Sequence, residues 1–128
     1  MPTTTGQNTC IERIGTAYNL SCTAVGDTLL ASIEAGRTFI PTIAYVRLTA
    51  VVGFVAVPSL SIGTNSTAYD NILGATALTG LITANTVYAM ALPTTVPAAT
   101  SDVYVKVATA TASATYTVAI DLFGYYQD

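Results

Sequence analysis

The sequence has no histidine and no tryptophan, and only four of its 128 residues are lysine or arginine. The absence of histidine excludes Ser-His-Asp and Cys-His catalysis and removes the commonest metal ligand. Two cysteines without a histidine cannot complete a structural zinc site within one chain. The sequence also contains neither a phosphate-binding loop nor a dinucleotide glycine fingerprint. We therefore expect a protein that is not an enzyme and that binds no metal or other cofactor.

Carboxylates are the one remaining source of acid–base chemistry, and the sequence holds seven of them, scattered along the chain. A glycosidase needs two carboxylates about 5–10 Å apart. The missing tryptophan also removes the usual aromatic platform for a sugar. These two features argue against a polysaccharide-cleaving enzyme.

The shortage of positive charge limits the partners of the chain. Its basic residues, Arg13, Arg37, Arg47 and Lys106, are too few and too scattered to form the patch that phosphate binding needs. The same argument excludes a polybasic membrane-surface role, and no apolar run is long enough to span a bilayer. The N-terminus, MPTTTGQNT, lacks the basic start and apolar run of a signal peptide. We expect no nucleic acid and no membrane as partners, and synthesis in a cytoplasm.

Apolar residues make up 52% of the chain and charged residues 9%, against a usual charged fraction of about 25%. A surface so poor in charge is either a solvated Thr-rich β-surface or one that other subunits partly cover, and we favour the second. The length suits one domain with one core.

The residues after Asp102 show two patterns of strict alternation, typical of half-buried antiparallel strands. Val103, Val105 and Val107 form the apolar face of the first. The apolar positions of the second are Tyr116, Val118, Ile120 and Leu122. We expect the two strands to form a hairpin across the short polar break between them, with the C-terminus built into the sheet.

Further strands are predicted upstream. Within the apolar stretch 39–57, residues 42–51 alternate, with Ala44, Val46 and Leu48 on one face and Tyr45 and Arg47 on the other. Arg47 marks the face nearer water or a partner, and Gly53 allows a turn or bulge before residues 54–57. Shorter strands are predicted around residues 60–62 and 87–92, and residues 63–75 read as a polar loop with an apolar end. Residues 27–34 fit a helical turn or a strand, and the Thr- and Val-rich surroundings favour the strand.

Seven or eight short strands with turn signals every 8–12 residues or so are the pattern of a β-sandwich. The predicted fold is all-β, an antiparallel, jelly-roll-like β-sandwich over residues 10–128. Residues 1–9 are polar and without periodicity, and are predicted to form an extended arm, flexible or ordered by a partner. Cys10 and Cys22 could form a disulfide or remain as thiols, and both readings stay open.

Three features are candidate binding elements. Asp70 lies between Asn65 and Asn71 in an oxygen-rich loop, which suits either Ca²⁺ binding or an Asx-type turn, and we favour the turn. Tyr125 and Tyr126 are equally suited to an interface and to a cap on the core. Asp121 is expected to pair with Arg47 or Lys106 across strands, or to lie at a subunit seam.

The stretch SIGTNSTAYDNIL, from Ser61 to Leu73, is followed by a Pro/Thr-rich turn and the ending VAIDLFGYYQD. In its Ile-Gly-Thr-Asn loop, alternating last strand and Gly-Tyr-Tyr close, the chain from about Phe39 onward resembles small bacteriophage virion proteins. These are β-sandwich modules that decorate capsids or form the heads of tail fibres. The resemblance implies a homotrimer or other symmetric oligomer whose flat apolar faces meet at an axis. It supplies no catalytic residues.

The chain begins with Met and is one domain long, so we expect a complete product rather than the tip of a fibre. The first hypothesis is a virion protein, made in the host cytoplasm, that decorates the capsid and contacts the major capsid protein or another virion protein. Its expected interface residues are Thr3, Thr4, Thr5, Tyr45, Arg47, Tyr125 and Tyr126. The alternative is a receptor- or glycan-binding module of a tail fibre. Its recognition loop would present Asn65, Tyr69, Asp70 and Asn71.

Overall fold

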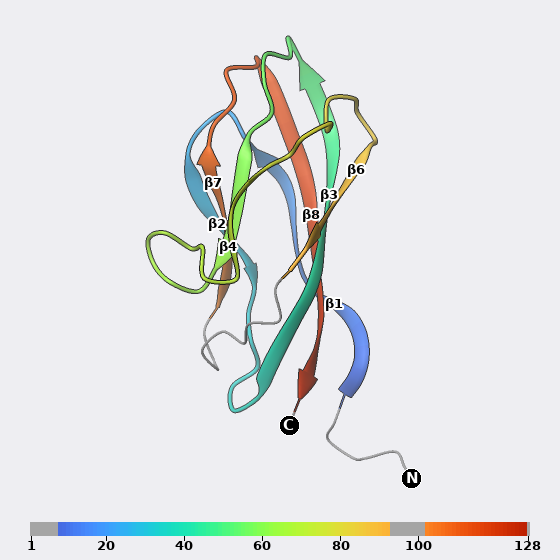
Figure 1. Cartoon of the computed structure of the whole chain (residues 1–128), viewed down its shortest axis with the longest axis vertical. Helices are drawn as coiled ribbons and strands as arrows, with labels where there is room; N and C mark the ends of the chain where they lie inside the picture. Colours follow the sequence, from blue (N-terminus) through green and yellow to red (C-terminus); the bar gives the residue numbers. More distant parts are fainter. Residues whose placement is uncertain (1–7, 93–101, 128) are drawn as a thin grey trace.

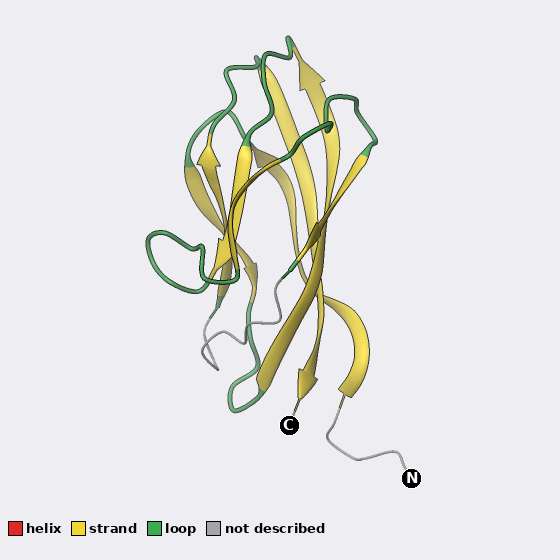
Figure 2. Ribbon diagram, in the orientation of Figure 1, coloured by secondary structure: helices red, strands yellow, loops and turns green. Residues whose placement is uncertain are grey.

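The computed structural model describes residues 8–92 and 102–127, and these residues form strands and loops without a helix (Figures 1 and 2). None of the described chain is a helix long and apolar enough to cross a membrane. The eight strands are β1 (Asn8–Ser21), β2 (Gly26–Ala31), β3 (Thr38–Val52), β4 (Ser59–Gly63), β5 (Leu73–Ala77), β6 (Val87–Ala91), β7 (Val103–Thr109) and β8 (Thr115–Gln127).

The strands form two four-stranded antiparallel sheets that pack face to face (Figure 1). Sheet A has the order β1-β8-β3-β6, and sheet B has the order β2-β7-β4-β5. The prediction of an all-β antiparallel sandwich is therefore confirmed. The longest pairing joins β3 to β8, from Thr38 opposite Gln127 to Val52 opposite Thr115.

The core lies between the sheets, and the alternation of the long strands explains it. Ala44, Val46 and Leu48 on β3 are fully buried, whereas Tyr45 and Arg47 between them are exposed, as predicted. Because successive side chains of a strand point to opposite faces, one face of each strand supplies the core. The apolar positions of β7 and β8 are buried in the same way: Val103, Val105, Val107, Tyr116, Val118, Ile120 and Leu122.

The predicted hairpin between the last two strands is wrong. β7 pairs with β2 and β4 in sheet B, whereas β8 pairs with β1 and β3 in sheet A. Each strand has one apolar face, and the chain buries both faces against each other by crossing from one sheet to the other instead of turning within a sheet. The polar break is this crossing. Within it, Thr111 donates its backbone N–H to the carbonyl of Cys22, and the hydroxyl of Ser113 accepts the N–H of Val55.

The predictions for the rest of the chain are confirmed in part. The strand interpretation of residues 27–34 is confirmed for residues 27–31 by β2, and residues 32–34 are a loop. The polar loop is shorter than predicted, because β5 begins at Leu73. The apolar run at 78–82 is a loop that buries Leu78 and Leu81. Residues 1–7, which include Thr3, Thr4 and Thr5, lie outside the described residues, and so does the turn at 93–101; β1 begins at Asn8.

The two cysteines are thiols: Cys10 is exposed and Cys22 is fully buried. Of the two readings left open by the sequence, the structure takes the thiols. Cys22 lies in the core cluster, and burial raises the pKa of its thiol to about 12.

Candidate interaction surfaces

The outer face of sheet A carries a groove of about 350 Å³. Side chains from all four strands of the sheet line it: Tyr18 from β1, Ala119, Asp121 and Phe123 from β8, Tyr45 and Arg47 from β3, and Val87 from β6. The hollow has a simple origin. Ala119 on the central strand is much smaller than the aromatic and long side chains around it, so its methyl group forms the floor.

The groove is apolar apart from the opposite charges of Asp121 and Arg47. Asp121 has a partner outside the groove. Nη1 of Arg13 lies 3.7 Å from Oδ1 of Asp121, which is a loose ion pair. The same Oδ1 atom is buried and accepts no hydrogen bond. Arg47 is exposed, and its guanidinium makes neither a hydrogen bond nor an ion pair with any part of the chain that the structure describes. The predicted pairing of Asp121 with Arg47 or Lys106 across strands of the same chain is therefore wrong, because Arg13 on the neighbouring strand β1 takes that place. The alternative, that Asp121 lies at a subunit seam, stays a prediction.

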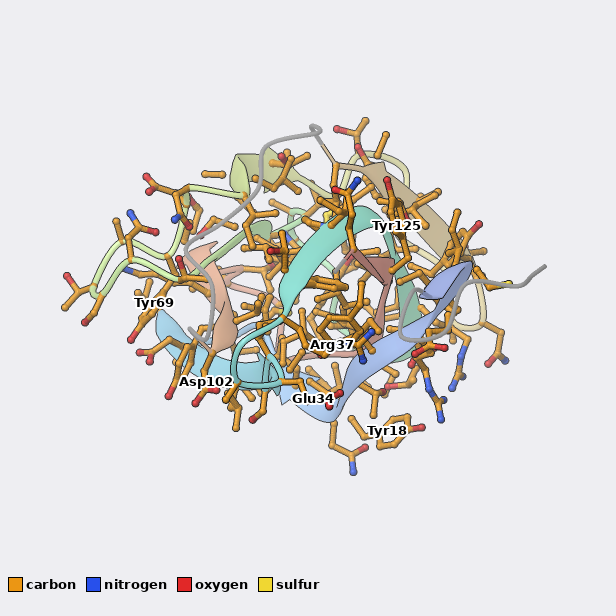
Figure 3. All side chains as sticks on the ribbon, turned by 90° about the horizontal axis from the view of Figure 1, so that it is seen from below. Tyr18, Glu34, Arg37, Tyr69, Asp102 and Tyr125 are labelled. Atoms are coloured by element: carbon orange, nitrogen blue, oxygen red, sulfur yellow. The ribbon has the colours of Figure 1, made fainter. Side chains whose placement is uncertain are left out.

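The two tyrosines near the C-terminus have different surroundings. Tyr125 is half-buried and shares the outward side of β8 with Asp121 and Phe123. Tyr126 points the other way and is buried. Figure 3 shows Tyr125 on the opposite side of the molecule from Tyr69 and Asp102. One tyrosine thus faces outward with the groove residues, and the other belongs to the core.

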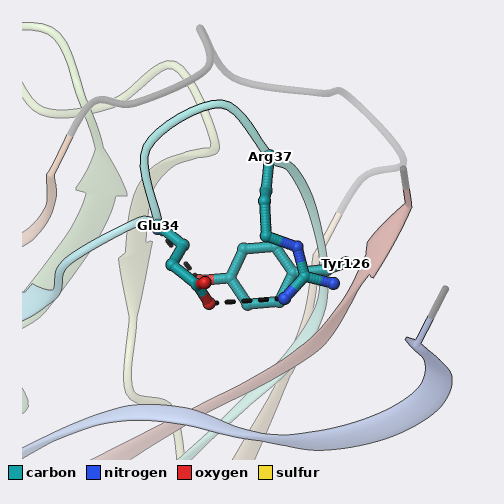
Figure 4. A network of polar contacts seen from close by, with 3 residues as sticks. All are labelled: Glu34, Arg37 and Tyr126. Atoms are coloured by element: carbon teal, nitrogen blue, oxygen red, sulfur yellow. Dashed lines mark hydrogen bonds and ion pairs between the residues drawn. The ribbon is translucent and has the colours of Figure 1, made fainter. Parts of the chain in front are cut away.

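Tyr126 closes the end of the core near the β2–β3 turn (Figure 4). Its ring packs against Phe39 at 5.7 Å between centroids, and the Arg37 guanidinium lies 4.2 Å above it. Its hydroxyl accepts the backbone N–H of Glu34 at 3.2 Å, and the Glu34 carboxylate pairs with Arg37 at 3.3 Å. For Tyr126, the core-cap reading agrees with these contacts.

The loop between β4 and β5 is ordered by its own asparagines. Oδ1 of Asn65 accepts the backbone N–H groups of Asp70 at 2.9 Å and Asn71 at 3.2 Å. Its amide nitrogen donates to the Asp70 carboxylate at 2.8 Å. The side chain of Asn71 bonds Thr64 twice, through N–H···Oδ1 at 2.7 Å and Nδ2–H···Oγ1 at 2.8 Å. The asparagines thus bond the backbone of their own loop, as the sequence favoured, but across five to seven residues instead of the two of an Asx turn.

Contacts with sheet B hold this loop in place. The ring of Tyr69 stacks on Tyr104 with 4.6 Å between centroids, and Nζ of Lys106 donates to the carbonyl of Thr67 at 2.9 Å. Asn65, Tyr69, Asp70 and Asn71 are thus brought together as predicted, but most of their polar groups are used within the loop. Among the residues with described positions, no group of three or more carboxylate or thiol side chains could hold a metal ion.

A third surface lies at the upper end of the molecule in Figure 1, where the β1–β2, β3–β4, β5–β6 and β7–β8 connections gather. Five large apolar side chains are exposed there: Val25, Val52, Phe54, Val55 and Ile82. The connections themselves, residues 22–25, 53–58, 78–86 and 110–114, contain no charged residue. We call this surface the apolar end.

The apolar end was not predicted, although the run VVGFVAV at residues 51–57 is a signal for it. Strand β3 ends at Val52, so the residues of this run cannot all face the core. In the groove, alternation along β8 could have grouped Phe123 with Asp121. Tyr18 and Val87 could not have been added, since their strands reach this face only through the strand order.

No protein-family model matches the chain, and no curated protein matches its sequence. Among solved structures, the fold is similar to that of a chain of the cyanophage Pam1 capsid asymmetric unit, with a TM-score of 0.59. The match covers 98% of this chain and 89% of that chain, at 16% sequence identity. At this identity the similarity shows a shared fold. At the level of the fold, it agrees with the resemblance to phage virion β-sandwich proteins.

Proposed function

We propose that this protein is a bacteriophage structural protein of the virion, without catalytic activity, which decorates and stabilises the capsid. It would do so through symmetric contacts with other copies of itself and with capsid subunits. The observation that carries the proposal is the fold, which is similar over almost the whole chain to that of a chain in a phage capsid asymmetric unit.

The strand order supports a jelly-roll form of the sandwich. β1 pairs with β8, β2 with β7, β3 with β6 and β4 with β5, all antiparallel, so that the first half of the chain runs alongside the second half. Jelly rolls are two-sheet, eight-stranded arrangements that recur in viral capsid domains.

The exposed surfaces support a role in bridging. The groove on sheet A and the apolar end lie on different parts of a small module, and each exposes large apolar side chains. Exposed apolar patches of this kind mark sites of protein contact. A module with two such surfaces can hold two neighbours at once, and attachment at several weak contacts raises the overall affinity by multivalency.

Reconstitution on capsids tests the proposal. Virions of the source phage, stripped of this protein by mild denaturant, are incubated with the purified chain, and its occupancy and the temperature of genome release are measured. We expect saturable binding at a copy number of the same order as that of the major capsid protein, and a higher release temperature. A virion that carries only a few copies, all on the tail, would contradict capsid decoration.

The same assay addresses the predicted arm. A chain lacking residues 2–7 keeps Asn8, which pairs with Tyr126 at the start of β1. If the arm orders on a capsid neighbour, this deletion lowers occupancy without lowering the melting temperature of the isolated protein. Unchanged occupancy would remove the arm from the mechanism.

The receptor- or glycan-binding alternative has less support from the geometry. The loop that would carry it uses the Asn65 and Asn71 side chains to hold its own backbone. Specific binding of the isolated protein on a glycan array, lost when Tyr69 and Asp70 are replaced by alanine, would favour this alternative over decoration.

A further inference from the structure

We propose that the outer face of sheet A binds the same face of a second copy of the chain, in a two-fold contact that pairs Arg47 of each copy with Asp121 of the other. The inference deepens the proposed function, on which it rests for its setting, by naming the partner of one of the two surfaces.

The positions of the two charges give the contact its symmetry. On the paired strands β3 and β8, Tyr45 lies opposite Asp121 and Arg47 lies opposite Ala119. The two charges are therefore diagonal neighbours on one outward face. Consider two such faces opposed to each other, with a two-fold axis between them that runs parallel to the faces. If this axis crosses the line from Arg47 to Asp121 at its midpoint and at a right angle, each Arg47 lies over the Asp121 of the other copy. A self-complementary patch of this kind is what a two-fold interface requires.

Neither charge has a close ion-pair partner within the described part of its own chain, and the second copy would supply one. Arg47 has no hydrogen bond or ion pair to any residue within 8–92 or 102–127. Asp121 has only the loose 3.7 Å approach of Arg13, which exceeds a normal charge-assisted hydrogen bond of about 2.7–2.9 Å. Oδ1 of Asp121 is buried, but 36% of the side-chain surface is exposed, so an incoming guanidinium can donate N–H groups to the other carboxylate oxygen. The reciprocal pairing would therefore add two strong contacts, one on each side of the axis.

The remaining surface of the groove suits burial against protein. Tyr18 and Val87 stand at its rims with 61% and 55% of their surface exposed, and Ala119 leaves a hollow between them. Tyr, Phe and Arg are enriched in the cores of protein interfaces, and Lys is depleted. The only lysine of the chain, Lys106, is on β7 of the other sheet. Aromatic side chains of the second copy can fill the hollow over Ala119, which excludes water from the charge pairs.

A two-fold contact here is compatible with the trimer that the resemblance implies. Such a trimer would form through another surface, and the apolar end is available for it. The sheet A contact would then join neighbouring trimers into a connected layer.

Charge reversal tests the pairing by light scattering over a concentration series. We expect the mass of the wild-type species to double with concentration. Arg47→Glu and Asp121→Arg, each alone, should raise the dissociation constant about a hundredfold or more, because each places two like-charged pairs across the axis. An equimolar mixture of the two variants should recover the doubled mass, since the introduced glutamate faces the introduced arginine and the remaining Asp121 faces the remaining Arg47.

Two further measurements fix the interpretation. Asp102→Arg makes the same charge change at an exposed position just before β7, on the other sheet, and should pair like the wild type. Circular dichroism melting verifies that each variant is folded, and Arg47→Glu, at an exposed side chain, remains a test if Asp121→Arg does not fold.

The inference is overturned if the wild-type mass never doubles, if Arg47→Glu doubles like the wild type, or if the folded mixture stays at the lower mass. Loss of capsid binding by Arg47→Glu with unchanged self-association also overturns it, because the face would then belong to the capsid subunit. Capsid binding by a wild-type chain that does not pair would leave the proposed function standing and remove only this contact.

Discussion

Single side chains join distant parts of this sandwich. Tyr116 is fully buried on β8, and its hydroxyl donates a hydrogen bond to the carbonyl of Leu81 in the β5–β6 connection. The backbone carbonyl of the same residue accepts the N–H of Cys22, where β1 has just ended. One residue thus ties β8, a central strand of sheet A, to two connections at the apolar end.

Removing the Tyr116 hydroxyl should be costly, because it leaves the Leu81 carbonyl without its donor in a buried place. We expect Tyr116→Phe to lower the free energy of unfolding by about 1–3 kcal/mol, measured by urea denaturation. Tyr18→Phe is the matched control, since its ring is exposed and the change should stay within about 0.5 kcal/mol. Equal effects of the two substitutions would contradict the role of the hydrogen bond.

At the scale of elements, the connection between β4 and β5 is built against the end of β4. Gly63 is buried, and a Cβ added to it would lie 2.5 Å from Oδ1 of Asn71, 2.5 Å from the carbonyl carbon of Tyr69 and 2.6 Å from the nitrogen of Asp70. Two of these three atoms belong to the backbone and cannot move without moving the loop. The glycine lets the loop pack directly on the strand.

Gly63→Ala should therefore displace the loop and lower the free energy of unfolding by about 1–3 kcal/mol, the usual cost of overpacking. Faster hydrogen exchange at the amides of Asp70 and Asn71 should accompany the loss. Gly74→Ala on β5 is the control, because nothing lies within 4 Å of its added Cβ. Unchanged exchange at both amides in Gly63→Ala would show that the loop does not depend on this contact.

The elements that could be predicted are those in which more and less buried residues alternate strictly, such as β7 and the middle of β3 at residues 44–48. β1 was missed because its register shifts against β8 in three places, and Asn19 in one of them has φ of +55°. Each irregularity moves apolar residues out of alternation. That β7 and β8 belong to different sheets could not be predicted either. Two strands with one apolar face each can bury those faces side by side in a hairpin or opposite each other in two packed sheets. For the candidate surfaces, Tyr45 and Arg47 could be placed together, whereas their neighbours Tyr18 and Val87 required the strand order.

At the scale of the whole molecule, stability depends on a core whose ionisable groups are neutral. Burial raises the pKa of the Cys22 thiol from 9.0 to about 12. It also raises the pKa of Tyr116 from 10.0 to about 12, with a further contribution from the negative charge that Cys22 would carry. Both groups hold their protons more tightly in the folded chain than in the unfolded chain.

Stability should therefore be fully present below about pH 9 and decline as the pH rises towards 12, because the unfolded chain releases these protons first. The free energy of unfolding, measured by urea denaturation across this range, should fall less steeply in Cys22→Ala than in the wild type. Parallel curves for the two proteins would contradict the assignment to Cys22.

The pairing of β1 with β8 also decides when this protein can fold. β8 is a central strand of sheet A, between β1 and β3, and in chain order it follows the other seven strands that the structure describes. During synthesis, β1 and β3 emerge first and must wait with their apolar faces uncovered until the residues up to Gln127 have left the ribosome. Pairings between distant parts of a chain also form slowly. Sheet A can thus be completed only after all four of its strands have been translated, and until then the apolar faces of β1 and β3 are open to contacts with other chains.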